Sequence, residues 1–541
     1  MMNATMNYVL YIFTPGSGIV FSKAGIDLII FSLIILILHH YIDIFYKAWK
    51  ETKHQNRIAG FHLSSSKYKK LHWLKGHSAL YPPDEEGLLK GVERTTEFPG
   101  IFNFHAAPCF SYVTFHHADT VKPLLASTAI KEKNIYGFWE PWIGEGLLTS
   151  NGKHWQRHRR LLTPAFHFGI LKSYIGTFNE CSKVMLDKWQ DAMKQPIEVF
   201  EDVGLLTLDT MMRCTMSSTT DCQKIKGHPY IKSIHSLSEI SMKRLDQPLY
   251  LIDWLFWLLP IGQRYYKEIK FVHSYTAKII SDRRKQLMQT AGSIHEIATE
   301  ENDEVYSKQR KVLDFIDVLL QSRDEDGSGL SDKEIRDEVN TFLFEGHDTT
   351  SSGISWALYN LAKYPKFQEK CRNEIHDVIE LKPNVEWEDL HKLPYLTMFI
   401  KESLRLYPPV WLIARELTED LSISSKYNKS GRDIPKGTRM SMHLFSLHRN
   451  PHLWDNPNDF IPERFSKENT TKLSSHAYLP FSAGSRNCIG QNFAMNEIKV
   501  VLAQTLRRFL LSLPEGEAPP VMAPMIVLKA KDGIKINFSV L

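Results

Sequence analysis

A single cysteine near the C-terminus has the surroundings that a metal-binding thiolate needs. Cys488 lies in the segment PFSAGSRNCIG, between Gly484 and Gly490 and two residues after Arg486. A ligating thiolate needs backbone N–H groups and positive charge near its sulfur, and glycines allow the tight turns that bring N–H groups close. The planar guanidinium of Arg486 suits a carboxylate partner. A lone cysteine in such a turn is most often a buried structural residue, so these features alone leave both interpretations open.

A second group of reactive side chains lies within a long predicted helix. Ser331 and Glu334 form a capping-box pattern, and no proline interrupts the helical pattern that follows to about Ala362. The helix contains the string FEGHDTT, which places the carboxylate of Asp348 beside the hydroxyl of Thr349. An acid next to an alcohol can relay protons, whereas in many helices threonines only donate to their own preceding turn.

Two neighbours qualify this motif. Gly346 is unfavourable inside a helix by roughly 1 kcal/mol relative to alanine, so we expect a local opening of the helix there. Glu345 precedes Thr349 by four residues and therefore shares its helix face. A lone glutamate on a helix is usually solvated. Glu345 becomes a candidate site residue only because Asp348 and Thr349 lie in the same motif.

The spacing F-x-x-G-x-R-x-C-x-G around Cys488 resembles the haem-binding signature of the cytochrome P450 superfamily. The resemblance extends from about Trp73 to the C-terminus. It implies a mainly α fold with small β-sheets, haem b, and Cys488 as the ligand of the iron. It also implies that Asp348 and Thr349 lie over the iron and organise proton delivery to dioxygen. Ser485 is a small departure, because proline is common at that position in the most similar branch.

The string FEGHDTT is similar to that of the fatty-acid ω-hydroxylase branch, in which the glutamate can form an ester with a haem methyl group; Glu345 is the matching residue. The resemblance assigns propionate contacts to Trp155, Arg159, Arg415 and Arg486. It further implies a buried network of Glu402, Arg405 and Arg464 behind the haem loop.

The implied activity is monooxygenation, most specifically ω-hydroxylation of a fatty acid or an eicosanoid with O2. No G-x-G-x-x-G fingerprint follows a strand in this chain, so electrons must come from a partner. The resemblance implies a membrane-bound NADPH–cytochrome P450 reductase, with cytochrome b5 as a second donor. Lys153, Arg157 and Arg160 are candidates for a basic face that meets an acidic partner, or an ordinary solvated cluster.

Two other functions remain open from the sequence. One is an O2-independent haem-thiolate isomerase or dehydratase of lipid hydroperoxides, and the other is a non-catalytic haem sensor or electron carrier. The acid and alcohol of FEGHDTT argue against both, because neither function needs proton delivery to dioxygen. The substrate is expected to be lipophilic, and the ranges 135–148, 249–257 and 410–413 are expected to line or gate its channel by analogy.

Composition limits the alternatives further. The formal net charge of +5 over 541 residues gives no indication of nucleic-acid binding. The six cysteines are scattered without a C-x-x-C pair, which argues against a zinc site and a disulfide framework.

The apolar run at residues 26–46 is expected to be a retained membrane anchor. It is followed by Lys47, Lys50 and Lys53, so the positive-inside rule places the remainder in the cytoplasm. We therefore expect an N-terminal segment 1–25, an anchor 26–46, a linker 47–72 and a haem domain 73–541, at the cytoplasmic face of the endoplasmic reticulum membrane.

Apolar periodicity predicts helices at 166–193, 271–287, 312–320 and 396–406, and strands at 101–104, 109–115 and 438–444. The aromatic segment from Leu249 to Pro260 allows two interpretations. A core helix is favoured slightly over a surface segment that dips into the membrane.

Overall fold

A computed structural model gives the fold of this chain. It describes residues 10–12, 19–21, single positions between 25 and 46, and then 81–107, 110–218, 221–297, 314–324, 326–380, 382–424, 426 and 433–541. Cys109, the linker 47–72 and the polar stretch 300–311 lie outside these residues.

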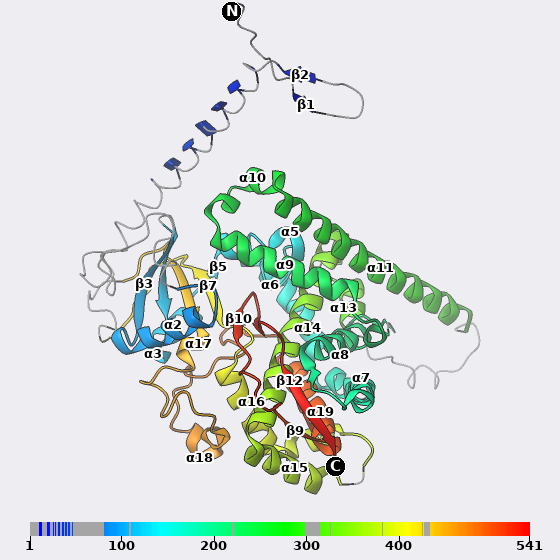
Figure 1. The fold of residues 1–541 in the computed structure, drawn as a ribbon. Helices are drawn as coiled ribbons and strands as arrows, with labels where there is room; N and C mark the ends of the chain where they lie inside the picture. The colour runs from blue at the N-terminus through cyan, green and yellow to red at the C-terminus, as the bar shows by residue number, and fades with distance from the viewer. Residues whose placement is uncertain are drawn as a thin grey trace, which may run out of the picture.

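The architecture is mainly helical, as predicted (Figure 1). The longer helices are α2 (Glu85–Glu97), α3 (Ala118–Ala126), α6 (Gly152–Leu162), α7 (Phe168–Ala192), α8 (Val199–Thr215), α9 (Pro229–Asp246), α11 (Pro260–Ile297), α14 (Asp332–Lys363), α15 (Pro365–Ile379), α16 (Pro394–Leu406) and α19 (Gln491–Arg508). Short helices are α4 (Lys133–Tyr136), α5 (Glu140–Ile143), α10 (Asp253–Leu258), α13 (Phe315–Gln321), α17 (Leu444–Leu447) and α18 (Lys467–Thr470), with 3-10 turns such as η5 (Pro248–Leu251) and η7 (Pro462–Phe465).

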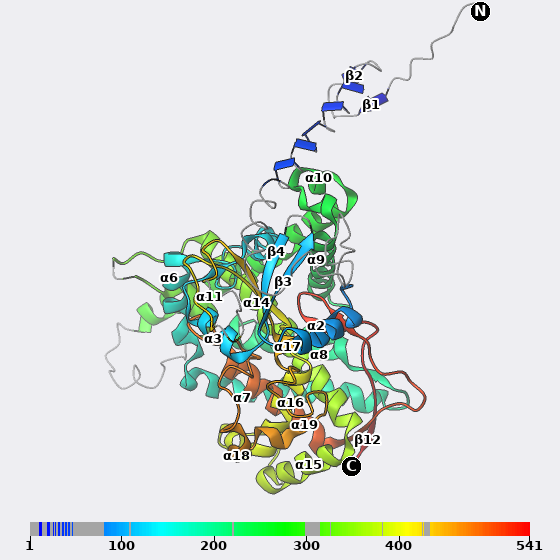
Figure 2. The same ribbon diagram turned by 90° about the vertical axis from the view of Figure 1, so that its left-hand side faces the viewer.

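The strands form small sheets at the periphery of the helical body. The largest has the order β3-β4-β8-β7-β5 and comprises β3 (Ile101–Ala107), β4 (Phe110–Phe115), β5 (Ile130–Lys131), β7 (Leu412–Glu416) and β8 (Arg439–His443). A three-stranded sheet joins β6 (Ile197–Glu198), β12 (Lys535–Val540) and β9 (Phe509–Ser512). A hairpin pairs β10 (Met522–Pro524) with β11 (Leu528–Ala530), and β1 (Leu10–Ile12) pairs with β2 (Ile19–Phe21). Figure 2 shows β3 and β4 from the side, with α2 and α17 below them.

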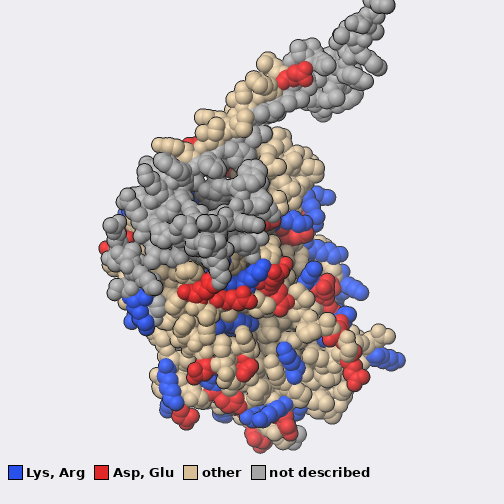
Figure 3. All heavy atoms as spheres, turned by 60° about the vertical axis from the view of Figure 1, so that its left-hand side comes forward, with Lys and Arg blue, Asp and Glu red and all other residues tan. Residues whose placement is uncertain are grey.

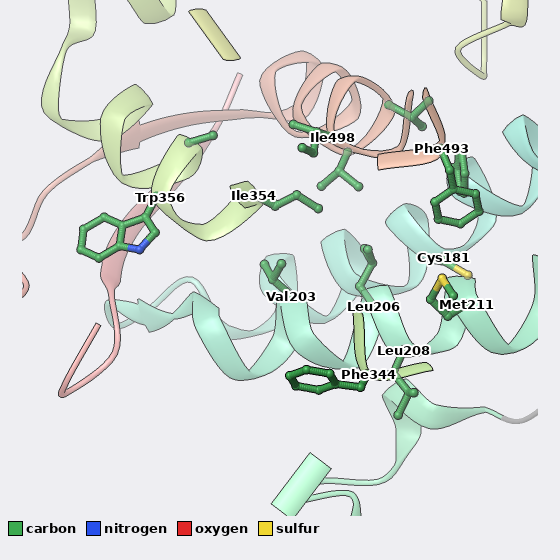
Figure 4. Packing of buried hydrophobic residues seen from close by; sticks show 14 of the residues in the cluster. Cys181, Val203, Leu206, Leu208, Met211, Phe344, Ile354, Trp356, Phe493 and Ile498 are labelled. Carbon is green, nitrogen blue, oxygen red and sulfur yellow. The ribbon is translucent and has the colours of Figure 1, made fainter. Parts of the chain in front are cut away.

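The central element is α14, which packs against α8, α19 and α16. Its start is fixed by the predicted capping box, since Ser331 accepts from the Glu334 amide and the Glu334 carboxylate accepts from the Ser331 amide. Ile354 of α14 lies between Val203 and Leu206 of α8 and Ile498 of α19 (Figure 4). Burying such aliphatic side chains contributes roughly 1.5–3 kcal/mol each, so α14 is held as a rigid support for the site.

The predicted elements are present, with one correction of environment. The segment 249–260 is not a core helix but a surface turn and the short helix α10. Phe256 is buried, whereas Leu249, Trp254 and Leu258 are exposed. The aromatic composition was misleading because only Ile252 and Phe256 are fully buried, while the other side chains of the segment are half-buried or exposed.

The predicted anchor at 26–46 lies largely outside the described residues. The positions that are described there are helical, and their large apolar side chains, among them Leu28, Phe31 and Ile35, are exposed. None of the described helices has the length and apolarity needed to cross a bilayer.

On the face of the molecule shown in Figure 3, acidic and basic side chains are interspersed and do not form separate patches of one charge.

Candidate active site

The segment that carries Cys488 is a tight loop leading into α19. The Cys488 amide donates to the carbonyl of Phe481 at 2.9 Å. Gly484 has φ +74°, and a Cβ there would lie 2.5 Å from the carbonyl oxygen of Leu125, so its conformation and its space both require glycine. Gly490 has φ −88° and room for a Cβ. Its contribution is instead an amide that donates to the Cys488 sulfur.

A buried network fixes the start of this loop. Arg405 donates to the carbonyl of His448 at 2.8 Å, and the His448 ring accepts from the amide of Leu479 at 2.9 Å. Burial, with the charge of Arg405, lowers the pKa of His448 to about 3, so its ring remains neutral and able to accept. The loop is therefore connected to α16 through one histidine.

The carboxylate of Glu402 holds both arginines of the network that the sequence predicts. Its oxygens accept from Arg405 at 2.7 and 2.9 Å and from Arg464 at 3.0 Å. Glu402 and Arg405 are fully buried, and such pairs are retained only when every donor and acceptor is matched.

One face of α14 opens toward the loop. Between Asp337 and Ala362 every residue is buried except Glu345, Gly346 and Thr349, which share one helix face. Cys488 is also exposed although it lies at the start of a core helix, and the Glu345 charge influences its pKa. The thiol and the accessible face of α14 therefore both lack full cover, and Glu345 lies close enough to Cys488 to influence its pKa.

The expected opening of α14 at Gly346 is wrong, because the helix is continuous from Asp332 to Lys363. A Cβ at Gly346 would lie 2.4 Å from the side chain of Met211 on α8. Glycine is needed there for close helix packing and not for a break.

Thr349 and Asp348 point to different surroundings. The Thr349 hydroxyl donates to the carbonyl of Glu345 at 2.7 Å. The Asp348 carboxylate forms an ion pair with Lys529 of β11 at 2.7 Å, and both side chains are buried. Although burial disfavours its ionised form, the charge of Lys529 holds the pKa of Asp348 below its usual value. No local motif in the sequence indicated Lys529.

Basic and aromatic side chains of α6 meet the Cys488 loop. The guanidinium of Arg486 lies 4.2 Å from the ring centroid of Trp155 and donates to the carbonyl of Ser150 at 2.8 Å. Arg159 donates to the carbonyl and the side chain of Asn487 at 2.8 and 2.9 Å. Three of the predicted propionate contacts are thus brought together around the loop.

Arg415 joins this group with a residue that the sequence did not reveal. Arg415 on β7 pairs in register with Lys131 on β5, and both side chains are buried. Burial and the charges of Arg415 and Arg486 lower the pKa of Lys131 well below its usual value. Burial and Arg415 lower the pKa of Arg486 to about 10.

These cations fit an anionic cofactor. Among the described side chains, none forms an ion pair with Lys131, Arg415 or Arg486, and burying like charges together is costly without anions. The two propionates of haem b would supply them. The surrounding protein desolvates the thiol of Cys488 and, with the charge of Glu345, raises its pKa to about 12, so a thiolate there requires a bound cation, as iron provides.

The predicted basic face is only partly free. Arg157 and Arg160 both bind the carboxylate of Asp324, and Arg157 also binds Glu334. Lys153 is exposed. Asp324 therefore neutralises two of the three positions proposed for partner docking.

Comparison with known proteins decides the family. The family model described as Cytochrome P450 matches residues 67–538. The chain belongs to the cytochrome P450 family. It is 44% identical over 474 residues to leukotriene-B4 omega-hydroxylase 3 of Mus musculus, covering 86% of this chain and 87% of that protein.

Two human relatives are similarly close. The chain is 43% identical to the ultra-long-chain fatty acid omega-hydroxylase over 85% of its length and 86% of the relative. It is 44% identical to cytochrome P450 4F2 over 85% of its length and 87% of the relative.

The chain is therefore a haem-dependent monooxygenase. Haem activates dioxygen, while the protein orients the substrate, excludes water and moves protons.

Proposed function

We propose that this cytochrome P450 hydroxylates the terminal carbon of a fatty acid or an eicosanoid. The observation that carries the proposal is the accessible face of α14, where Glu345 and Thr349 are not fully buried and the charge of Glu345 influences the pKa of the exposed Cys488. Relatives whose names specify leukotriene B4 and ultra-long-chain fatty acids support the substrate class. A terminal methyl is less reactive than its neighbouring methylene, so selectivity for the chain end must come from steric positioning.

In this proposal Cys488 ligates the iron, and Asp348 with Thr349 governs proton delivery. Trp155, Arg159, Arg415 and Arg486, joined by Lys131, hold the propionates. The haem domain spans 73–541.

Glu345 is proposed to form an ester with a haem methyl group. Desolvation by the surrounding protein raises the pKa of Glu345 to about 7, and the charge of Lys131 opposes this effect. An ester would remove a carboxylate that is costly to bury and would fix the cofactor edge beside the substrate. Acid extraction should leave haem on the wild-type chain and release it from Glu345→Gln; complete release from both would refute the ester.

The electron donor is proposed to be NADPH–cytochrome P450 reductase, with cytochrome b5 as a second donor. The location is proposed to be the endoplasmic reticulum membrane, with the haem domain cytoplasmic. Exposed apolar side chains at Leu28 and Phe31 and, on α10, Trp254 and Leu258 support membrane contact. In Figures 1 and 2, α10 lies at the end of the molecule that is nearest the described positions between 25 and 46.

The test is reconstitution with reductase and NADPH in lipid vesicles. Leukotriene B4, arachidonate and saturated fatty acids of increasing length are offered, and product positions are read by mass spectrometry. We expect the terminal alcohol to dominate, and Cys488→Ser to form none. Predominant subterminal hydroxylation would refute the proposed selectivity, and NADPH-independent conversion of a lipid hydroperoxide as the main reaction would favour an isomerase.

A further inference from the structure

A polar cavity reaches α14 at Asp348. It has a volume of about 450 Å³, and its lining includes Glu198, Glu201, Lys232, His235, Asp348 and Lys529. Cys488, Glu345 and Thr349 are not among its lining residues. Asp348 therefore stands between this polar cavity and the accessible face of α14, one residue from Thr349.

Three titratable groups form a line from solvent to Asp348. His235 on α9 is exposed, and its Nε2 lies 3.3 Å from Nζ of Lys529. Lys529 is only 6% exposed and lies 2.7 Å from Oδ1 of Asp348, which is 5% exposed. Each contact is within or near hydrogen-bond distance, so the line is continuous.

The inner end of this line has free acceptor capacity. Oδ2 of Asp348 is buried and has no hydrogen-bond partner in the described part of the protein. Burying an ion pair seldom adds stability compared with apolar side chains of similar size, and an unpaired buried oxygen adds a further cost. Stability alone therefore gives a weak reason for this arrangement.

We propose that the cavity beside β11 is the entry for solvent protons, and that His235 and Lys529 pass them to Asp348. The proposal rests on the assignment of Asp348 and Thr349 to proton delivery, and it adds the residues that resupply them. Monooxygenation consumes two protons and two electrons for each O2 and substrate, and releases one water with the alcohol, so protons must reach the site in every turnover.

The transfer balances as a sequence of proton shifts without change of oxidation state. An N–H bond of the Lys529 ammonium breaks as an O–H bond forms on Asp348. The resulting neutral amine takes a proton from the His235 imidazolium, and His235 takes one from solvent. The groups that face His235 are Lys529, Asp348, His347 and Glu239. Partial desolvation by the surrounding protein and the charge of Lys529 lower the pKa of His235, which favours its release of a proton near neutral pH.

Lys529→Arg is the sharpest test. Arginine keeps the ion pair with Asp348 but does not release a proton at working pH. His235→Gln keeps a polar side chain at an exposed position without proton transfer. Lys467→Arg and His376→Gln are matched controls at exposed sites that do not line this cavity.

Reconstituted holoenzymes are compared by product formed per NADPH, by the solvent isotope effect and by peroxide-driven turnover. Because general acid–base steps contribute about 10²–10⁴-fold and water offers a partial bypass, we expect Lys529→Arg and His235→Gln to lower coupling by about 3- to 10-fold. Their solvent isotope effects should rise, and peroxide-driven turnover should stay near wild type. The two controls should keep wild-type coupling.

A second measurement is independent of turnover. The rate of carbethoxylation of His235, followed by mass spectrometry across pH, reports its pKa. Lys529→Met removes a neighbouring positive charge and should raise that pKa, whereas Lys529→Arg should leave it close to wild type. If the pKa of His235 stays at its wild-type value in Lys529→Met as well as in Lys529→Arg, the contact between Lys529 and His235 on which the relay depends is overturned.

Asp348→Asn and Thr349→Ala distinguish a failure of the relay through His235 and Lys529 from a failure of the assignment of Asp348 and Thr349 to proton delivery. If they lower coupling and the Lys529→Arg and His235→Gln variants do not, the relay is wrong and the site assignment stands. If none of the four lowers coupling, both fail. An equal fall in NADPH-driven and peroxide-driven turnover together with lower thermal stability would show a structural role and overturn the relay.

Discussion

Replacing Arg405 with lysine should destabilise the haem loop while keeping the charge. Each of the five N–H groups of Arg405 donates one hydrogen bond: two to Glu402, and one each to the carbonyls of His448, Pro457 and Asp459. Lysine has three donors, so at least two of these five hydrogen bonds are lost. At about 1–3 kcal/mol for each lost hydrogen bond of a buried charged group, Arg405→Lys should cost about 2–6 kcal/mol.

The lower bound corresponds to about a 30-fold change in the ratio of folded to unfolded protein. Thermal and denaturant unfolding, followed by tryptophan fluorescence and by the thiolate band of the reduced carbon monoxide complex, measure it. Both signals should be lost together, because His448 connects Arg405 to Leu479 at the start of the Cys488 loop.

Arg464→Lys is the matched control. Arg464 also binds Glu402, but its remaining bonds go to exposed carbonyls of Asp455, Asn456 and Asp459, where water can replace a lost donor. We expect its cost to stay below about 1 kcal/mol, as for other solvated charge contacts. Equal effects of the two substitutions, or wild-type stability of Arg405→Lys, would refute the donor-counting argument.

Other substitutions probe the loop glycine, the cation cluster and the two histidines His443 and His448. Gly484→Ala should abolish most of the thiolate band because its Cβ would meet a backbone carbonyl oxygen at 2.5 Å. Gly437→Ala is the control: Gly437 has φ +79° and nothing within 4 Å of a Cβ, so the substitution should cost only the local backbone strain of about 1–3 kcal/mol. Similar losses of the band in both variants would contradict this reasoning. Lys131→Met should accelerate haem transfer to apomyoglobin by about 10-fold or more, as expected for a lost charge-assisted hydrogen bond, and an unchanged rate would remove Lys131 from the propionate site. Burial lowers the pKa of His443 and His448 to about 3, so the unfolded chain binds more protons below about pH 6.5. The free energy of unfolding should therefore fall by about 1.4 kcal/mol per pH unit for each histidine as the pH drops from about 6.5 toward 3. In unfolding measurements at pH 5, 6 and 7, His443→Gln should remove the part of this pH dependence that His443 contributes.

Features set by neighbouring residues were predictable from the sequence. The capping box of Ser331 and Glu334 needs only a spacing of three, and the Cys488 loop is specified within eleven residues. The main helices followed from apolar periodicity for the same reason.

Features set by distant partners were not predictable. Lys131 acquires its role from a strand pairing with Arg415, and Lys529 from the position of β11 beside α14. Gly346 was interpreted from helix propensity alone, while the deciding neighbour is Met211 on another helix. Propensity is a local quantity, and tertiary packing can reverse its meaning.

The hydrogen bond from Thr349 to the Glu345 carbonyl makes this hydroxyl a rotor with a preferred orientation. With its proton directed into the helix, the oxygen offers two lone pairs elsewhere, and Thr349 initially receives hydrogen bonds instead of giving them. Releasing one neutral hydrogen bond costs about 1 kcal/mol, which is only about a fivefold bias. Rotation about the Cβ–Oγ bond can therefore turn the acceptor into a donor without moving the backbone. Serine would preserve this rotor at position 349, and valine, nearly the same shape, would remove it.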